Sequence, residues 1–340
     1  MKANLRKTYN ILIRLAVAIS TIAFIYDQLF YRKDISSVFD AFSNISQGFS
    51  LNIFLTFTLI LFPVNILLES IKWKYLVDKL ETVSLYTSIK GVVVGKTVSM
   101  IMPNRVGDYV GRVFILKKAD RIQAVLATIL GSLAQMITTI IFGLTALIFI
   151  FPEYLDITVV TNAWLYTGLV VVIIFIIFIL IFTYLNFSFF SVIIKKFSGK
   201  YYVKIEKYAK VFSWYNQKEL LNVLLLSIFR YIVFSLQFYL LLRFFGLDIS
   251  YFVAMMLISI TYILMTIIPT IALTEIGIRG SISMYVFKHH FDALGLWNSE
   301  FSLGVVSASS MLWLINLIFP AIAGTIFVFS LKFFRKNNGN

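Results

Sequence analysis

Positive charge inside apolar sequence is the feature of this chain most suited to chemistry. Arg230 lies 12 residues beyond Lys218 in an apolar run, which places it roughly 18 Å along a helix. In a hydrocarbon core about 30 Å thick, that position is near the middle of a membrane. A charge at that depth is costly and normally faces a cavity or a counter-ion. Because a guanidinium binds phosphate or carboxylate with two hydrogen bonds, Arg230 is predicted to clamp such a group, with Gln237 on the same helical face.

A broken segment supplies further candidates. Residues 99–121 read SMIMPNRVGDYVGRVFILKKADR, so a proline, glycines and charges interrupt the apolar sequence. Irregular backbone at membrane depth occurs only inside protein or beside water, because lipid offers no hydrogen bonds. The segment is therefore expected to form a site. Its candidates are Pro103, Asn104 and Gly107 as a hairpin tip, Lys96, Arg105 and Arg112 for substrate binding, and Asp108 as a coupling or ion-pairing acid.

A similar segment follows later in the chain. Residues 265–287 read MTIIPTIALTEIGIRGSISMYVF and again carry a proline, then an acid, then an arginine four residues beyond the acid. These residues are Pro269, Glu275 and Arg279. The correspondence predicts an internal repeat with a second hairpin whose tip holds Pro269. The alternative is ordinary pairing of acid and base one helical turn apart.

The acids allow two interpretations. Glu69 is expected at the end of a span, as an interfacial acid near Lys72. Asp108 and Glu275 would suit proton coupling, and a structural ion pair with one of the three acids is the alternative role for Arg230. No catalytic triad, metal-binding group or phosphate-binding glycine loop can be assembled from the sequence. We therefore predict no catalytic residue, no metal and no cofactor.

The composition indicates the class of protein. Of 340 residues, 60% are hydrophobic and 14% charged, and the mean hydropathy is +0.89, as in integral membrane proteins. The absence of cysteine excludes disulfides and thiol nucleophiles. The formal net charge of +14 indicates positive-inside topology and affinity for anionic lipid. Nucleic acid is not expected as a partner, because the basic residues flank apolar spans.

Six spans are predicted, over about 12–30, 50–71, 122–151, 159–185, 219–245 and 301–331. The second is expected to end in an aromatic and basic interfacial anchor of Lys72, Trp73 and Lys74. With the N-terminus inside, 20 of the 30 Lys and Arg residues flank cytoplasmic ends and four flank outer ends. This bias predicts a multi-pass protein of the cytoplasmic membrane with both termini in the cytoplasm. The basic segment 195–218 is expected at the same face as an interfacial element.

The orientation gives the two broken segments opposite directions. The hairpin 84–118 opens from the cytoplasm, whereas the hairpin 251–290 opens from outside. The single membrane domain 1–340 then divides into inverted repeats, 12–151 and 159–331, an arrangement typical of transporters with a site at the repeat interface. The predicted fold is an all-α polytopic membrane protein with two re-entrant helical hairpins. Ten shorter spans are the alternative.

Several of these residues also resemble a known family, that of the transmembrane, flippase-like region of lysylphosphatidylglycerol synthases. The resemblance is carried by Trp73-Lys74, by Pro103-Asn104-Arg105-Val106-Gly107-Asp108 with Gly111-Arg112, and by Pro269, Glu275, Gly277 and Arg279. It spans nearly the whole chain and includes members without the synthase domain. It implies a role in moving a lipid with a charged or phosphorylated headgroup, but no lysyl transfer.

The sequence therefore favours a lipid flippase whose partners are membrane lipids, anionic or polyprenyl-linked. Two alternatives stay open. One is a membrane-embedded transferase or phosphatase acting on a polyprenyl-phosphate lipid, and the other is an accessory subunit of an envelope biosynthesis complex. The oligomeric state does not follow from the sequence.

Overall fold

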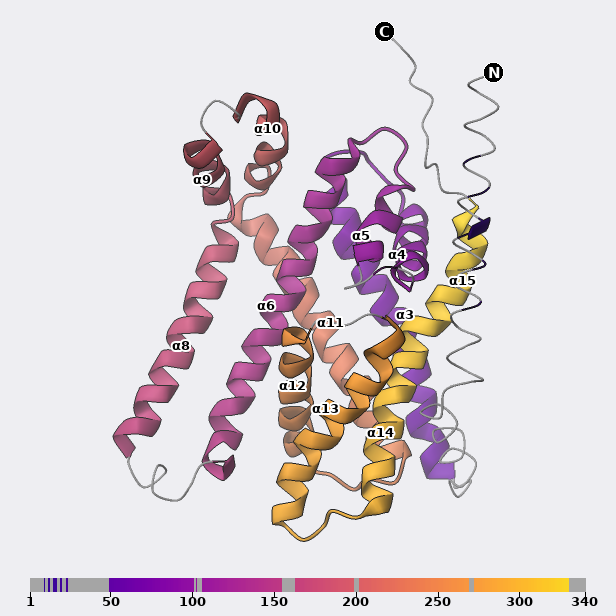
Figure 1. Ribbon diagram of the computed structural model, residues 1–340, viewed down its shortest axis with the longest axis vertical. Helices are drawn as coiled ribbons and strands as arrows, with labels where there is room; N and C mark the ends of the chain where they lie inside the picture. The colour runs from indigo at the N-terminus through magenta and orange to yellow at the C-terminus, as the bar shows by residue number, and fades with distance from the viewer. Residues whose placement is uncertain are drawn as a thin grey trace.

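The computed structural model describes residues 49–100, 102, 106–154, 163–198, 202–268 and 272–329, and positions 9, 12, 15, 16, 19 and 23. All regular elements in these ranges are helices (Figure 1). Pro103, Asn104, Arg105 and Pro269, and most of the expected span 12–30, lie outside the described residues.

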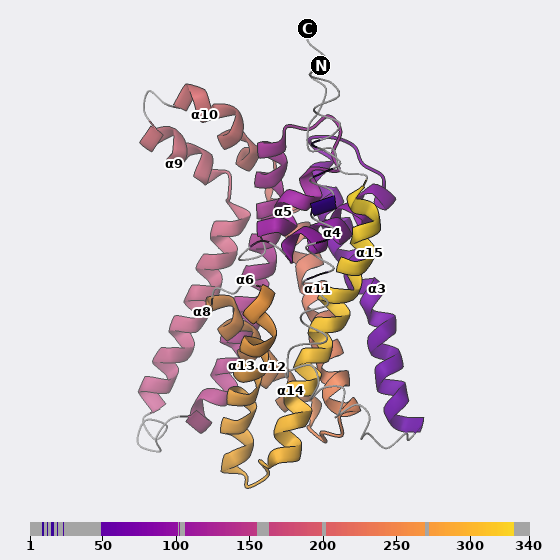
Figure 2. The same ribbon diagram turned by 45° about the vertical axis from the view of Figure 1, so that its right-hand side comes forward.

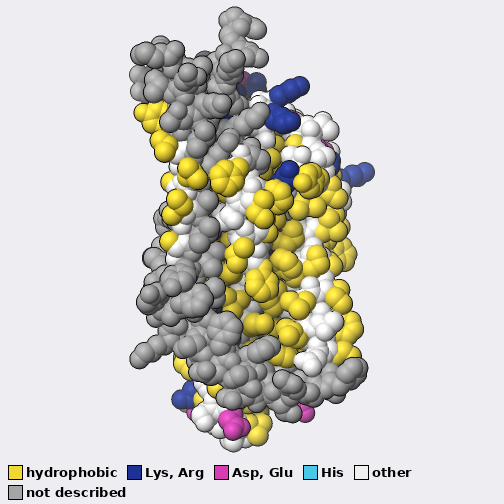
Figure 3. All heavy atoms as spheres, turned by 90° about the vertical axis from the view of Figure 1, so that its right-hand side faces the viewer, with side chains coloured by type: hydrophobic (Ala, Val, Ile, Leu, Met, Phe, Trp, Pro, Cys, Tyr) yellow, Lys and Arg dark blue, Asp and Glu magenta, His cyan; other side chains and the backbone are white. Residues whose placement is uncertain are grey.

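Five helical segments are long and apolar enough to cross a membrane. They are α3 (Phe49–Val77), α6 (Arg121–Tyr154), α8 (Ala163–Leu185), α11 (Gln217–Phe244), and the continuous run of α14 (Ser299–Trp313), the π-helix η4 (Leu314–Ile318) and α15 (Phe319–Val328). On the face drawn in Figure 3, apolar side chains form a broad belt, and Lys and Arg gather mainly at the upper end. The prediction of an all-α multi-pass membrane protein is confirmed for this part of the chain.

Shorter helices occupy the two expected hairpin regions, 84–118 and 251–290, which include the broken sequences and which we call the first and second broken segments. The first contains α4 (Leu85–Ser99) and α5 (Val106–Val113), and the second contains α12 (Tyr251–Ile267) and most of α13 (Ala272–Ala293). Figures 1 and 2 place α4 and α5 in the upper half of the molecule and α12 and α13 in the lower half. The segment between α8 and α11 forms α9 (Phe189–Ser198), α10 (Tyr202–Ala209) and η3 (Lys210–Ser213) at the upper end.

Local sequence explains where several helices begin. Ser84 caps α4 by accepting a hydrogen bond from the Thr87 backbone, and Asn216 forms a capping box with Glu219 at the start of α11. Side chains of this kind satisfy backbone donors that the first turn leaves free.

The π-helix in the last span is also explained by local sequence. Pro320 has no N–H to continue the α-helical ladder, and the Phe319 N–H bonds instead to the Leu314 carbonyl.

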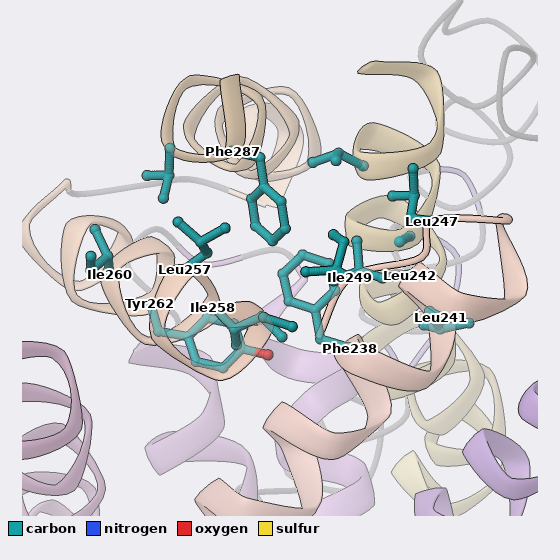
Figure 4. Close-up of a cluster of buried hydrophobic side chains, with 14 of the residues drawn as sticks. Phe238, Leu241, Leu242, Leu247, Ile249, Leu257, Ile258, Ile260, Tyr262 and Phe287 are labelled. Carbon is teal, nitrogen blue, oxygen red and sulfur yellow. The ribbon is translucent and has the colours of Figure 1, made fainter. Parts of the chain in front are cut away.

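A buried apolar cluster fixes α12 and α13 against α11 and α14. The ring centroids of Phe238 in α11 and Phe287 in α13 are 6.3 Å apart. Leu241 of α11 and Leu257 and Ile258 of α12 belong to the same cluster, and all five side chains are essentially inaccessible (Figure 4). Burying one such side chain contributes about 1.5–3 kcal/mol relative to exposure, although in lipid the packing contacts matter more than the exclusion of water. The second broken segment is thus held in a fixed position beside the long helices.

The expected interfacial anchor at the end of the second span is wrong for two of its residues. Helix α3 continues to Val77, so Lys72 and Trp73 lie inside the bundle and are buried. The Trp73 indole donates to Thr128 Oγ1 at 3.0 Å, and Lys74 remains partly exposed in a pair with Asp78. The position where the apolar sequence ends does not mark the membrane interface here, because polar residues of a helix can be covered by protein as well as by water.

The glycines of the first broken segment are not helix breakers. Gly107 and Gly111 lie within α5 and are buried. A Cβ on Gly111 would approach the Gly95 Cα of α4 to 2.9 Å, and a Cβ on Gly107 would collide with the Val98 backbone. These residues therefore allow α5 to pack directly on α4, as small residues do between membrane helices. Gly107, expected at the hairpin tip, belongs to the first turn of α5.

Candidate functional site

A cavity of about 540 Å³ lies between the two broken segments and the long helices. Small-molecule sites commonly have volumes of about 300–1,000 Å³. Helices α3, α4, α6, α11, α12, α13 and α14 and the π-helix η4 line the cavity. Its charged lining residues are Glu69, Lys96, Arg230, Glu275 and Arg279. All five were predicted as binding or ion-pairing residues, although Glu69 was expected at the membrane interface. They come from both halves of the chain.

Glu69 is the centre of the charged network rather than an interfacial acid. Its carboxylate is buried and receives three cations. Arg112 Nη1 contacts Oε1 at 2.6 Å, while Lys72 Nζ and Arg230 Nη1 contact Oε2 at 2.9 Å and 3.3 Å. A buried carboxylate is tolerated only with such compensation. The Glu69 carboxylate therefore connects α3, α5 and α11 through ion pairs.

Arg112 is held away from the cavity. Its Nε donates to Asp108 Oδ1 at 3.0 Å and its Nη2 to Oδ2 at 2.5 Å, which is the forked geometry that arginine and carboxylate prefer. Its third contact is Glu69, and only 4% of its side chain is exposed. Two carboxylates thus bind the guanidinium of Arg112, a residue that was predicted to bind substrate. In this arrangement Arg112 fastens α5 to α3.

Arg230 is the more accessible cation of the network. Its side chain is 19% exposed, against 2% for Lys72, and it lines the cavity. Its Nε donates to Asn65 Oδ1 at 2.8 Å and its Nη1 to Gln135 Oε1 at 3.0 Å. Neutral amides position the guanidinium, and its 3.3 Å contact with Glu69 is the longest of the three ion pairs on that acid. Arg230 can therefore turn toward an anion while Glu69 keeps two counter-ions.

The π-helix reaches this network directly. Asn65 Nδ2 donates to Asn316 Oδ1 at 2.8 Å, and Asn316 Nδ2 donates to the Leu312 carbonyl one turn earlier. Asn316 also lines the cavity. Single π-helical turns occur often at functional sites. Here the turn carries the amide that orients Asn65 and, through Asn65, Arg230.

The second broken segment supplies an ion pair to the opposite wall. Arg279 Nε donates to Glu275 Oε1 at 2.8 Å, with side-chain exposures of 14% and 5%. Lys96 of α4 lines the same cavity, is buried, and acts electrostatically on Asp108. The pairing of acid and base four residues apart explains part of the Glu275 and Arg279 pattern. Pairing alone does not explain why both residues also lie in the cavity wall.

Gln237 is not brought to the site. It is fully buried and donates to the Thr58 carbonyl at 3.0 Å. Gln237 lies seven residues beyond Arg230 on the same face of α11, but α3 covers that face at the level of Gln237. Sequence reasoning also missed Asn65, Lys72 and Asn316. The first two lie four residues before and three residues after Glu69, a helical stripe that the sequence contains.

These observations define a multi-helix membrane protein whose helices surround a charged cavity. Residues 11–289 match the family of the lysylphosphatidylglycerol synthase TM region, and the chain belongs to this family. The resemblance drawn from the sequence is thereby confirmed. No curated protein and no solved structure matches the chain.

Proposed function

We propose that the protein is a flippase that moves a lipid with a charged or phosphorylated headgroup across the cytoplasmic membrane. The observation that carries this proposal is Arg230, a partly exposed guanidinium in a cavity walled by both broken segments. A headgroup with phosphate charge cannot cross about 30 Å of hydrocarbon alone. A protein lowers that barrier by offering a compensating cation along the way while the tails stay in lipid.

Two features support an inverted repeat with re-entrant hairpins as the architecture for this movement. The pair α4–α5 lies in the upper half of the molecule, and α12–α13 lies in the lower half (Figure 2). Both pairs contribute to the cavity wall, through Lys96 from α4 and through Glu275 and Arg279 from α13. Transporters of this design bind substrate where the repeats meet and expose it to each side in turn.

The ion pairs suit repeated binding and release. When an anionic headgroup takes Arg230, Glu69 retains Lys72 and Arg112 and stays neutralised. When the headgroup leaves, Arg230 returns to Glu69 and to its amide partners. Neither stage leaves the Glu69 carboxylate without a cation, so the barrier to exchange stays low. Glu275 offers the corresponding resting partner to Arg279 on the opposite wall.

The proposal is tested with purified protein in lipid vesicles. A phosphatidylglycerol analogue with a fluorescent acyl chain is added, and the fraction reached by an impermeant quencher is followed with time. We expect protein-containing vesicles to exchange the analogue between leaflets faster than protein-free vesicles, with the lipid chemically unchanged. Equal rates would refute the flippase. A converted lipid would favour the enzyme instead.

A further inference from the structure

Helix α9 follows directly on a membrane span. Helix α8 is long and apolar enough to cross a membrane, and only residues 186–188 separate its end at Leu185 from the start of α9 at Phe189. In Figure 2, α9 runs across the end of α8 instead of continuing it. A helix joined to a span in this way lies at the boundary between hydrocarbon and water, where amphipathic helices bind.

One face of α9 packs on protein. The ring of Phe190 stacks on Phe187 with centroids 4.5 Å apart, and Phe187 meets Phe212 of η3 edge to face at 5.2 Å. In the turn before α9, Asn186 Oδ1 accepts a hydrogen bond from Gln217 Nε2 of α11 at 2.9 Å. These contacts fix the rotation of α9 about its axis, so its opposite face points outward.

The outward face of α9 combines apolar and basic side chains. Phe189, Val192 and Phe197 are each more than half exposed, and Lys195 and Lys196 are exposed as well. Phe189, Val192 and Lys196 follow one another at intervals of three and four residues, which places them on one side of the helix. Apolar side chains that are exposed together mark a surface that contacts lipid or protein.

The adjoining span indicates that this contact is lipid. Along α8, apolar side chains such as Ile174 and Phe178 are exposed, and in a bilayer such side chains pack against acyl chains. The exposed side chains of α9 follow within a few residues. There a phenyl ring can enter the acyl boundary while the long stems of Lys195 and Lys196 carry their ammonium groups to lipid phosphates. Basic side chains at this depth attract anionic lipid.

We infer that α9 lies in the membrane surface and that Lys195 and Lys196 bind anionic lipid headgroups there. The site holds lipid beside the protein at the end of α8. None of its residues lines the cavity, so this lipid is distinct from the one that the proposed function would move. The site does not depend on that function.

The next helices of the basic segment turn toward the protein. Val211 of η3 is buried, and Lys210 pairs with Glu206 at 2.8 Å. Lys195 also acts electrostatically on Glu206. We therefore expect Lys196, on the same side of α9 as Phe189, to contribute more to lipid binding than Lys195.

The test places a bimane fluorophore at position 192 through Val192→Cys in this cysteine-free chain. The full-length protein is reconstituted in phosphatidylcholine vesicles that hold a small fraction of lipid with a nitroxide on its acyl chain, which quenches bimane only at short range. Nitroxide-labelled phosphatidylglycerol and phosphatidylcholine are compared at equal fractions. We expect phosphatidylglycerol to quench about threefold more strongly at low salt. The ratio should fall toward one in 1 M salt, where the Debye length is about 3 Å.

Matched variants tie the preference to α9. Lys196→Gln should reduce the preference by more than half, and adding Lys195→Gln should remove it. Lys117→Gln combined with Lys118→Gln makes the same change of charge in the exposed turn between α5 and α6 and should keep the preference. Arg230→Ala should keep it as well, because the cavity takes no part.

Three outcomes would overturn the inference. Quenching by neither lipid would show that α9 does not contact the bilayer. Equal quenching by both lipids in the protein with native lysines would show contact without recognition of charge. Loss of the preference in Arg230→Ala would assign it to the cavity. The proposed function fails separately, through absence of lipid exchange, and the comparison at two salt concentrations decides the inference even if the lysine variants do not fold.

Discussion

Asn65 Nδ2 donates a hydrogen bond to Asn316 Oδ1 at 2.8 Å, between residues 251 positions apart in the chain. The contact joins α3 of the first half to the π-helix of the second. It also leaves Asn65 Oδ1 facing the guanidinium of Arg230, which donates to it. The position of the central cation therefore depends on a helical irregularity that Pro320 introduces into the last span.

Removing the side-chain amide of Asn316 should lower the stability of the protein. In Asn316→Ala, the Asn65 donor loses its partner, and we expect a loss of about 1–3 kcal/mol in the free energy of unfolding. Because Asn65 and Asn316 act through one contact, Asn65→Ala combined with Asn316→Ala should cost less than the sum of the two single substitutions. Thermal unfolding in detergent measures the cycle. Strict additivity would mean that the two amides do not act together.

Glu69 should be the least replaceable acid of the protein. Glu69→Gln removes the partner of three buried or partly buried cations, and breaking such a network costs about 3–5 kcal/mol. Adding Lys72→Met should restore part of the stability, because one uncompensated charge is removed. As a matched control, Glu206→Gln loses a solvent-exposed pair with Lys210 and should leave stability unchanged. A Glu69→Gln protein as stable as the wild type would contradict the central role of this carboxylate.

The contact between α4 and α5 should tolerate no side chain at Gly111. In Gly111→Ala the new Cβ meets Gly95 Cα at 2.9 Å, and overpacking of this kind costs about 1–3 kcal/mol. Gly168 on α8 has no atom within 4 Å of the corresponding position. Gly168→Ala should therefore be neutral or stabilising by up to about 1 kcal/mol, because alanine favours the helix. Equal unfolding temperatures for the two variants would argue against the close packing.

The orientation in the membrane can be measured directly in this cysteine-free chain. Lys196→Cys places a thiol on exposed α9, and Leu296→Cys places one in the exposed turn between α13 and α14. In intact cells an impermeant maleimide should label position 296 and spare position 196 until the membrane is opened. The reverse pattern would overturn the proposed cytoplasmic location of the basic segment.

The sequence predicted the elements better than the contacts. Five spans follow from long apolar runs, which need no partner to be recognised. Arg230, Glu275, Arg279 and Lys96 were identified because charge at membrane depth needs a cavity or a counter-ion, and all four line the cavity. Their shared location was expected only from the repeat pattern.

Other features of the site depend on packing that sequence spacing does not encode. Lys72 looked interfacial because apolar sequence ends nearby, yet α3 continues and buries it. Arg112 was predicted to bind substrate, with pairing to Asp108 one turn earlier as the alternative. That pair is present, and Glu69 adds a second acid that the spacing did not indicate. Gln237 shares a helical face with Arg230, but α3 covers it at its own level. The roles of Asn65 and Asn316 depend on a contact between distant segments.

The most direct test of the account is lipid movement by Arg230 variants in vesicles. Arg230→Ala should abolish exchange of the lipid between leaflets, and Arg230→Lys should restore it only in part, because an ammonium lacks the forked geometry of a guanidinium. Arg243→Ala, on the same helix but paired with Asp248 away from the cavity, is the matched control and should move lipid as the wild type does. Transport at the wild-type rate by folded Arg230→Ala protein would contradict the mechanism.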